Sequence, residues 1–177
     1  MTIYHWYSGE KYAGYECADE EYGDKLLFRK VELDINSWIP PRLKMGPGPR
    51  KKGDCHIYPG LIPPWIILSQ RATLELEPFL KNAGDLLPVI LEDRPDEPFF
   101  VFICRTVIDC LDTEKTTDVL TKPIFQDDIK LESQVFSIPQ AHMRNYVSNL
   151  FVEKVVEAKL RGFSFTREYM DPNGIVT

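Results

Sequence analysis

The chain has 177 residues, of which 44% are hydrophobic and 12% aromatic, enough to bury the core of one compact domain. Its 27 Asp and Glu against 21 Lys and Arg give a formal net charge of -6, which argues against nucleic acid and anionic membranes as general partners. The sequence lacks an apolar run approaching the ~20 residues of a membrane helix, and its first residues lack the basic start of a secretory signal. We therefore expect one cytoplasmic domain.

Residues 1–60 are expected to be the variable part of this domain. Residues 2–7 and 25–33 are rich in aromatic and β-branched side chains and predict two strands. Residues 40–60 hold five prolines and four glycines, a density that opposes regular hydrogen bonding. This stretch predicts a long surface loop, which precedes a core formed by residues 61–177.

The core opens with a strand and a helix. Residues 65–68 are a continuous apolar run that predicts a strand, and Ser69 is placed to cap a helix over residues 71–83. Pro78 lies inside that helix, where its ring and missing amide are expected to kink the helix or to force a new start.

Further strands follow in the second half of the chain. Residues 87–91 and 99–104 flank a charged turn and predict a hairpin, and residues 130–138 predict another strand. Strands outnumber helices in this sequence. The predicted fold class is α+β, with a mostly antiparallel sheet and a few helices packed on one face of it.

The end of the chain predicts a strand, a capped helix and a second strand. Ser148 can cap a helix over residues 149–161, and Gly162 can end it before a strand at residues 163–166. Four apolar side chains are expected on the packed side of this helix: Phe151, Val152, Val155 and Val156.

Asp109 and Asp112 are spaced three residues apart and are candidates for a metal site or a shared proton. The alternative, which we favour, is that Asp112 begins a turn and that Asp109 lies at a strand end. A divalent metal would also need a third acidic or histidine ligand, and the sequence does not identify one.

Other catalytic patterns are weak. His56 follows Cys55, but adjacent residues on a strand point apart, and a nucleophilic cysteine needs a base within hydrogen-bond reach. The sequence contains no H-E-x-x-H, Walker loop or G-x-G-x-x-G. We assign no catalytic, cofactor or metal residues. The four cysteines, which include no C-x-x-C pair, are expected to be reduced: Cys17, Cys55, Cys104 and Cys110.

Two charge clusters are candidates for partner binding. A basic cluster could grip phosphates, but it is interpreted as a solvated loop unless aromatic residues lie beside it: Arg42, Lys44, Arg50, Lys51 and Lys52. An acidic run interleaved with tyrosines could anchor a basic protein or could be a mobile acidic loop: Tyr12, Tyr15, Glu16, Asp19, Glu20, Glu21, Tyr22 and Asp24.

Five pieces of the sequence occur in an order shared with a known family. They are Trp-Ile-Ile-Leu-Ser at 65–69, Gly-Asp-Leu-Leu-Pro at 84–88, an aromatic strand at 99–103, Val-Ile-Asp-Cys-Leu-Asp at 107–112, and the closing Val-Ser helix with Gly-Phe-Ser-Phe at 147–165. The chain thereby resembles, over about residues 61–169, a family of immunity proteins from bacterial polymorphic toxin systems. It departs from the pattern at residues 104–106 and at Thr116 and Thr117.

The resemblance implies a protein that binds a cognate toxin domain in the cytoplasm and neutralises it without chemistry or cofactor. The toxin is expected to be basic at the contact. Two alternatives stay open: a small metal-dependent hydrolase that uses Asp109, Asp112 and a histidine, and a housekeeping protein-interaction module.

Overall fold

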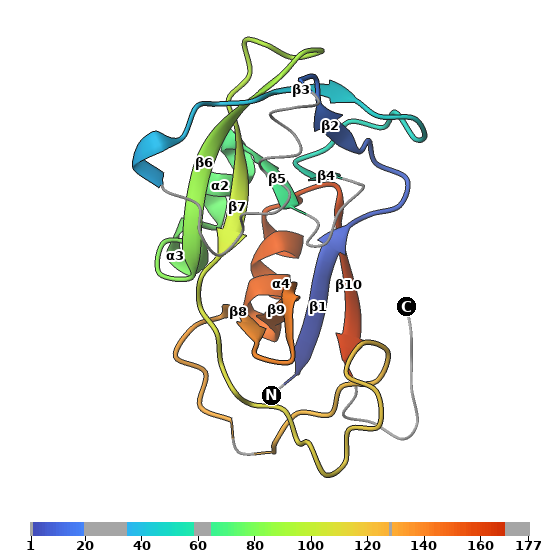
Figure 1. Cartoon of the computed structure of the whole chain (residues 1–177), viewed down its shortest axis with the longest axis vertical. Helices are drawn as coiled ribbons and strands as arrows, with labels where there is room; N and C mark the ends of the chain where they lie inside the picture. Colours follow the sequence, from blue (N-terminus) through green and yellow to red (C-terminus); the bar gives the residue numbers. More distant parts are fainter. Residues whose placement is uncertain (1, 20–34, 59–64, 128, 169–177) are drawn as a thin grey trace.

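The computed structural model describes residues 2–19, 35–58, 65–127 and 129–168. These residues form ten strands in two sheets and three short α-helices, an α+β arrangement dominated by strands (Figure 1). The predicted strand at residues 25–33 lies outside the described residues. Within the described ranges, no helix is both long and apolar enough to cross a membrane.

The first sheet has four antiparallel strands in the order β10-β1-β9-β8. Its strands are β1 (Ile3–Ser8), β8 (Val135–Ile138), β9 (Ala141–Ser148) and β10 (Phe163–Glu168). The N-terminal strand therefore lies inside the sheet, paired on both sides by strands from the end of the chain. The prediction of a strand near residues 2–7 is confirmed, whereas β8 is shorter than the predicted 130–138.

The second sheet has six strands in the order β2-β3-β6-β7-β5-β4. Its strands are β2 (Tyr15–Cys17), β3 (Arg42–Met45), β4 (Cys55–Tyr58), β5 (Trp65–Ser69), β6 (Gly84–Leu91) and β7 (Phe99–Cys104). The sheet is mixed because β3 runs parallel to β6. It curls until Gly14, just before β2, bridges Ile57 of β4, so that its two ends nearly meet. The predicted hairpin is confirmed as β6 and β7.

The expected long loop over residues 40–60 is wrong in part, because this stretch contains β3 and β4. Each of these strands has four residues and fits between the prolines and glycines of the stretch. Both are completed by partners from the core, since β3 pairs with β6 and β4 pairs with β5. Proline density alone did not reveal these short strands, which depend on pairing with distant segments.

The first two helices follow β5. Ser69 caps α2 (Gln70–Glu75), as predicted, by accepting a 3.2 Å hydrogen bond from the Ala72 amide. The predicted single helix over 71–83 is broken at Leu76, and α3 (Glu77–Leu80) starts there with Pro78 in its first turn. A short 3₁₀ turn, η1 (Ile35–Ser37), lies earlier in the chain.

The closing helix α4 (Asn149–Glu157) is capped by Ser148, whose hydroxyl accepts from the Phe151 amide at 3.5 Å. The predicted cap is confirmed, but the helix ends before residue 161. Lys159, at φ 51°, takes the left-handed conformation that ends it. Gly162, at φ 94°, serves another purpose, because a Cβ there would overlap the carbonyl oxygen of Cys55. Gly162 thus allows the chain after α4 to pass directly beside β4.

The packed side of α4 is narrower than expected. Phe151 and Val155 are 0% and 3% exposed, whereas Val156 is 69% exposed. The placement of Val156 on the packed side is therefore wrong. At about 100° per residue, Val156 lies about 140° from Phe151, beyond the edge of the apolar stripe.

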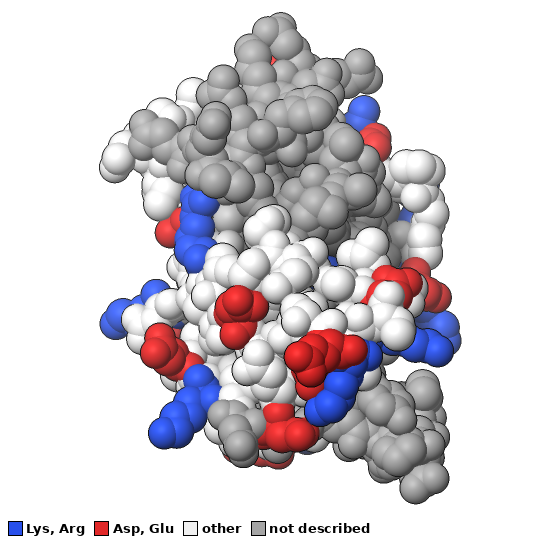
Figure 2. Space-filling model, turned by 60° about the horizontal axis from the view of Figure 1, so that its bottom comes forward, with Lys and Arg blue, Asp and Glu red and all other residues white. Residues whose placement is uncertain are grey.

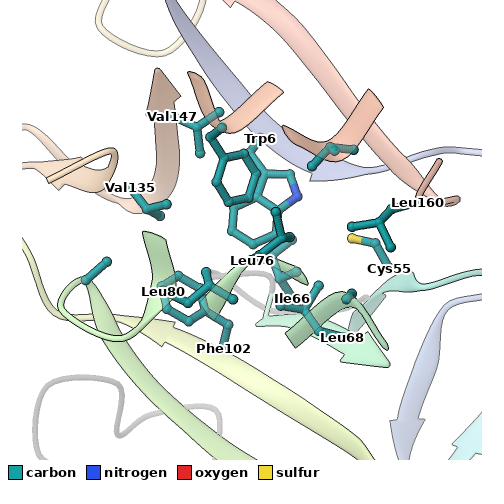
Figure 3. Packing of buried hydrophobic residues seen from close by; sticks show 14 of the residues in the cluster. Trp6, Cys55, Ile66, Leu68, Leu76, Leu80, Phe102, Val135, Val147 and Leu160 are labelled. Atoms are coloured by element: carbon teal, nitrogen blue, oxygen red, sulfur yellow. The ribbon is translucent and has the colours of Figure 1, made fainter. Parts of the chain in front are cut away.

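Both sheets share one central cluster of buried side chains, so the expectation of a single sheet with helices on one face is corrected (Figure 3). Trp6 of β1 lies at its centre, with its ring centroid 5.0 Å from that of Phe151 and 5.8 Å from that of Phe102. Further members come from the helices and from both sheets: Ile66, Leu68, Leu76, Leu80, Val135 and Val147. The helices pack between the sheets because each sheet turns an apolar face toward them.

The other face of the four-stranded sheet has a different cover. Residues 105–127 and 129–134, named here the covering segment, contain isolated bridges and turns but no regular helix or strand. Its Cys110, Leu111 and Phe125 are buried against Ile3 and Tyr146 of the sheet. Figure 1 shows this segment passing around the end of the molecule opposite β2 and β3.

Candidate functional site

A hollow of about 650 Å³ opens on the outer face of the four-stranded sheet, beside the covering segment. We call it the sheet hollow. Its floor is formed by His5 and Tyr7 of β1, Arg144 of β9 and Thr166 of β10, and one wall includes Lys122. These side chains share a face because alternate residues of a strand point to the same side of a sheet.

The floor is held by pairing across three strands. His5 lies opposite both Tyr146 of β9 and Thr166 of β10. Its ring centroid is 5.4 Å from that of Tyr7, and the Thr166 hydroxyl donates to the Tyr7 hydroxyl at 3.1 Å. The floor therefore presents hydroxyl groups and an imidazole in fixed positions.

The wall is a turn built on Asp118. One carboxylate oxygen of Asp118 accepts from the Leu120 amide at 2.8 Å, and the other accepts from the Thr121 hydroxyl at 2.7 Å. The hydrogen bond from the Thr121 side chain is the main cause that lowers the pKa of Asp118. This turn places Lys122 at the edge of the hollow.

The charge inside the sheet hollow is set by its neighbours. Burial, with the nearby Arg144 as a second cause, lowers the pKa of His5 from 6.5 to about 4. His5 is therefore neutral near pH 7, and Arg144 and Lys122 supply the positive charge beside Glu10. Hydroxyls, a neutral imidazole and two cations suit recognition of a polar ligand by hydrogen bonds.

The structure does not bring Asp109 or Asp112 into the sheet hollow. Asp112 accepts from the Lys115 amide at 3.1 Å and pairs with its ammonium at 2.9 Å, which makes it a turn residue, as we favoured. Asp109 lies outside the named strands, so its expected place at a strand end is wrong. It accepts a 3.2 Å hydrogen bond from the side-chain amide of Gln140, in the turn between β8 and β9. Among the described residues, no group of three His, Cys, Asp or Glu is placed to hold a metal.

Cys55 and His56 have structural surroundings. Cys55 is fully buried, and burial raises the pKa of its thiol. His56 is also buried, with Nδ1 3.0 Å from the Ala13 carbonyl and Nε2 2.9 Å from Arg94 Nη2. A guanidinium can only donate, so Nε2 accepts and Nδ1 carries the proton. Burial, as the main cause, lowers the pKa of His56 to about 4. The four cysteines are free and buried.

The acidic run is only partly on the described surface. Tyr15 is 0% exposed, with its hydroxyl accepting from Arg94 at 2.9 Å, so its ring does not reach a partner. Glu16 pairs with Lys44 at 3.5 Å, and Asp19 is exposed. Tyr12 is partly buried beneath the Lys51 ammonium, 4.8 Å from its ring centroid. Glu20, Glu21, Tyr22 and Asp24 lie outside the described residues.

The basic cluster is largely neutralised. Arg42 pairs with Glu92 at 3.6 Å and Lys52 with Asp93 at 2.9 Å, while Lys44 and Lys51 take the partners given above. On the face drawn in Figure 2, acidic and basic side chains are likewise interspersed rather than separated by sign. Arg42, Lys44 and Lys52 pair with carboxylates, as expected of a solvated surface. Tyr12 lies beside Lys51, however, so an aromatic residue of the kind expected for phosphate binding is also present.

No protein-family model matches the chain, and no curated protein sequence matches it. The family resemblance therefore depends on the quoted sequence pieces alone. The residues of the sheet hollow were missed by sequence reasoning, although alternation along residues 3–8 carried a signal. Ile3, His5 and Tyr7 share one side of this strand, and two of the three are polar or amphipathic.

Proposed function

We propose that this chain is an immunity protein that binds a cognate toxin domain in the cytoplasm and blocks it by covering its active site or another essential surface. The observation that supports the proposal is that most of the family-like pieces contribute to one packed unit. The strand at 65–69, the aromatic strand at 99–103 and the closing unit from residue 147 all supply members of the central cluster. The resemblance thus follows the scaffold of the protein rather than scattered surface positions.

Binding without turnover also agrees with how the reactive side chains are used. Cys55 is buried with a raised thiol pKa, and His56 is hydrogen-bonded to the backbone and to Arg94. Asp112 is engaged by the backbone and ammonium of Lys115. These groups stabilise the fold and are not poised as a nucleophile with a base.

The contact proposed for the toxin is the acidic run beginning on β2. Of its described members, Asp19 is exposed, and Tyr12 and Glu16 are partly exposed. The net charge of -6 favours a toxin that is basic at the contact. Opposite charge raises the association rate, and that gain falls as salt screens it.

The test is co-expression with the product of the neighbouring open reading frame, followed by association kinetics on the purified pair if that product is toxic. Replacing Glu20, Glu21 and Asp24 with Lys is expected to slow association about tenfold at low salt, since steering charges act mainly on the association rate. The matched control replaces Glu114, Asp127 and Glu132, three exposed acids of the covering segment, with Lys. The control should retain most of the wild-type rate.

Two results would contradict the proposal. The first is a neighbouring domain that is harmless when this chain is absent, which would favour a housekeeping interaction module. The second is a toxin that is equally harmful with and without this chain. Equal association rates for the two triple variants would remove the acidic run from the contact while leaving the immunity function in place.

A further inference from the structure

A second recess, of about 380 Å³, lies where four separate segments meet beside the ends of β4 and β5. We call it the arginine recess. Its charged lining residues are Lys52, Asp54, Arg71, Arg94, Glu97 and Arg161. Lys52 pairs with Asp93 at 2.9 Å, just outside the recess, and Arg71 faces Asp54 at 3.7 Å. The cations of the recess that carboxylates balance least are therefore Arg94 and Arg161.

The recess exists because the chain after α4 passes next to β4. The carbonyl oxygen of Arg161 accepts from the amides of Asp54 and Cys55 at 2.7 and 3.0 Å. Gly162 permits this approach, since a Cβ at that position would overlap the Cys55 carbonyl. The backbone of Arg161 is thus fixed independently of its side chain.

Asp54 belongs to the frame of the recess. Its side chain accepts from the Ser69 hydroxyl at 3.0 Å and from the Arg161 amide at 2.9 Å, and Arg71 lies 3.7 Å away. The Asp54 residue is only 7% exposed. Its charge is therefore already engaged by these groups and does not cancel that of the other arginines.

Arg94 is a buried arginine whose contacts hold its guanidinium in one position. Its side chain is only 8% exposed and lies over the ring of Phe99, 4.3 Å from the centroid. Nη2 donates to the Tyr15 hydroxyl and to His56, and Nη1 lies 3.9 Å from Glu97. Nε is buried and makes no hydrogen bond in the described part of the chain. The contacts of Arg94 are with neutral groups and with two carboxylates at long range, so its charge is incompletely balanced.

Arg161 supplies the second guanidinium. Its side chain is exposed and, among the residues that the structure describes, has neither a hydrogen bond nor an ion pair. Arginine forks match the geometry of phosphate and carboxylate oxygens. A volume of about 380 Å³ is at the lower end of small-molecule sites.

We propose that the arginine recess is a binding site for a small anion bearing a phosphoryl or carboxylate group, held by Arg94 and Arg161 with Arg71 at its edge. The recess is lined by none of the described residues of the acidic run, although Arg94 donates to the buried Tyr15 of that run, and the proposal does not depend on the immunity function. The buried Arg94 fixes the ligand, and the exposed Arg161 closes over it.

The test is a titration of the full chain with inorganic phosphate, pyrophosphate and citrate in low-salt buffer, followed by amide chemical shifts and calorimetry. Binding is expected to move the amide signals of residues 52–54, 69–71 and 161. Arg161→Gln should weaken binding about tenfold, because one charge-assisted contact is lost while the backbone contacts remain. Arg161→Lys should recover part of the loss, since it keeps the charge without the fork.

The matched control is Arg50→Gln, which removes an exposed arginine outside the recess and should leave the affinity unchanged. Tighter binding of the two phosphates would identify a phosphoryl ligand, and tighter binding of citrate a carboxylate ligand. The proposal is overturned if none of the three probes binds the wild-type chain at 10 mM or below, on the order of weak anion affinities. Equal weakening by Arg50→Gln and Arg161→Gln would also overturn it, because the effect would then be one of general charge.

Discussion

The two faces of the four-stranded sheet are covered in different ways. The inner face packs Trp6 and Phe163 against Phe151 of a regular, capped helix, with the rings of Trp6 and Phe163 stacked at 5.8 Å. The outer face is covered by the covering segment, whose backbone forms only isolated bridges and turns. The inner cover continues into the central cluster, while the outer cover leaves the sheet hollow open.

This difference shows how a hollow can form where a sheet is covered by a segment without regular secondary structure. The covering segment is held by long-range backbone hydrogen bonds, such as Asp112 N to Ile124 O at 2.7 Å and Ser137 N to Thr106 O at 2.9 Å. Such a segment can stop short of covering a sheet, and the uncovered strands then present polar side chains. A helix that packs on a sheet through an apolar stripe instead covers apolar side chains and leaves no exposed polar floor.

The largest effect is expected on the inner face, from Val155→Asp. Val155 is 3% exposed in the central cluster, so the substitution buries an unpaired carboxylate. We expect a loss of about 4 kcal/mol or more in the free energy of unfolding, measured by urea denaturation.

Val156→Asp is the matched control, because Val156 is 69% exposed one residue further along the same helix. It should change the free energy of unfolding by about 0.5 kcal/mol or less. Similar losses for the two variants would show that α4 packs on a different side.

A smaller effect is expected on the outer face, from Phe125→Ala. Phe125 is 2% exposed and packs edge to face on Tyr146, with centroids 5.3 Å apart. The substitution should cost about 3 kcal/mol by leaving a cavity. Amide exchange should speed up across the covering segment more than in α4, since the segment can open without unfolding the central cluster. Uniform acceleration in both regions would contradict a separate outer cover.

The smallest effect concerns the two histidines with lowered pKa, His5 on the outer face and His56 of β4. Each has a folded-state pKa of about 4, below the value of 6.5 for the free side chain. The unfolded chain therefore takes up protons first, and stability present above pH 6.5 is lost as the pH falls toward 4.

Between pH 7 and pH 5, His56 should contribute a loss of about 2 kcal/mol, and His5 less because it is partly open to solvent. Denaturation at several pH values, together with imidazole titration by NMR, measures both contributions. Stability that stayed constant down to pH 5 would contradict the neutral state of His56 and its role as an acceptor for Arg94.

Much of the local structure was predictable from the sequence. The caps at Ser69 and Ser148, the restart at Pro78 and the β6–β7 hairpin follow from short-range preferences, and each occurs as expected. The predictions failed where the local pattern was too short or where apolar residues continued beyond the buried positions. β3 and β4 have four residues each, too few for an alternating pattern to be recognised. Val156 belongs to an apolar run in which the sequence does not distinguish buried from exposed positions.

The candidate sites were less predictable. The acidic run contained Tyr15, whose burial follows from the curl of the six-stranded sheet around it rather than from its neighbours in sequence. The arginine recess joins Arg94 to Arg161 across 67 positions of the chain, the difference between their numbers in the sequence. Single arginines in charged turns carry no signal that they will converge.

The sequence by itself determined the serine caps at which α2 and α4 begin and the position of the β6–β7 turn. Only the tertiary structure decided that there are two sheets, that the covering segment leaves a hollow, and that Gly162 brings Arg161 beside β4. The physical reason is the distance along the chain over which each kind of interaction acts. Caps and periodicity act over a few residues, whereas recesses depend on strand pairing and close backbone contacts between segments that are distant along the chain.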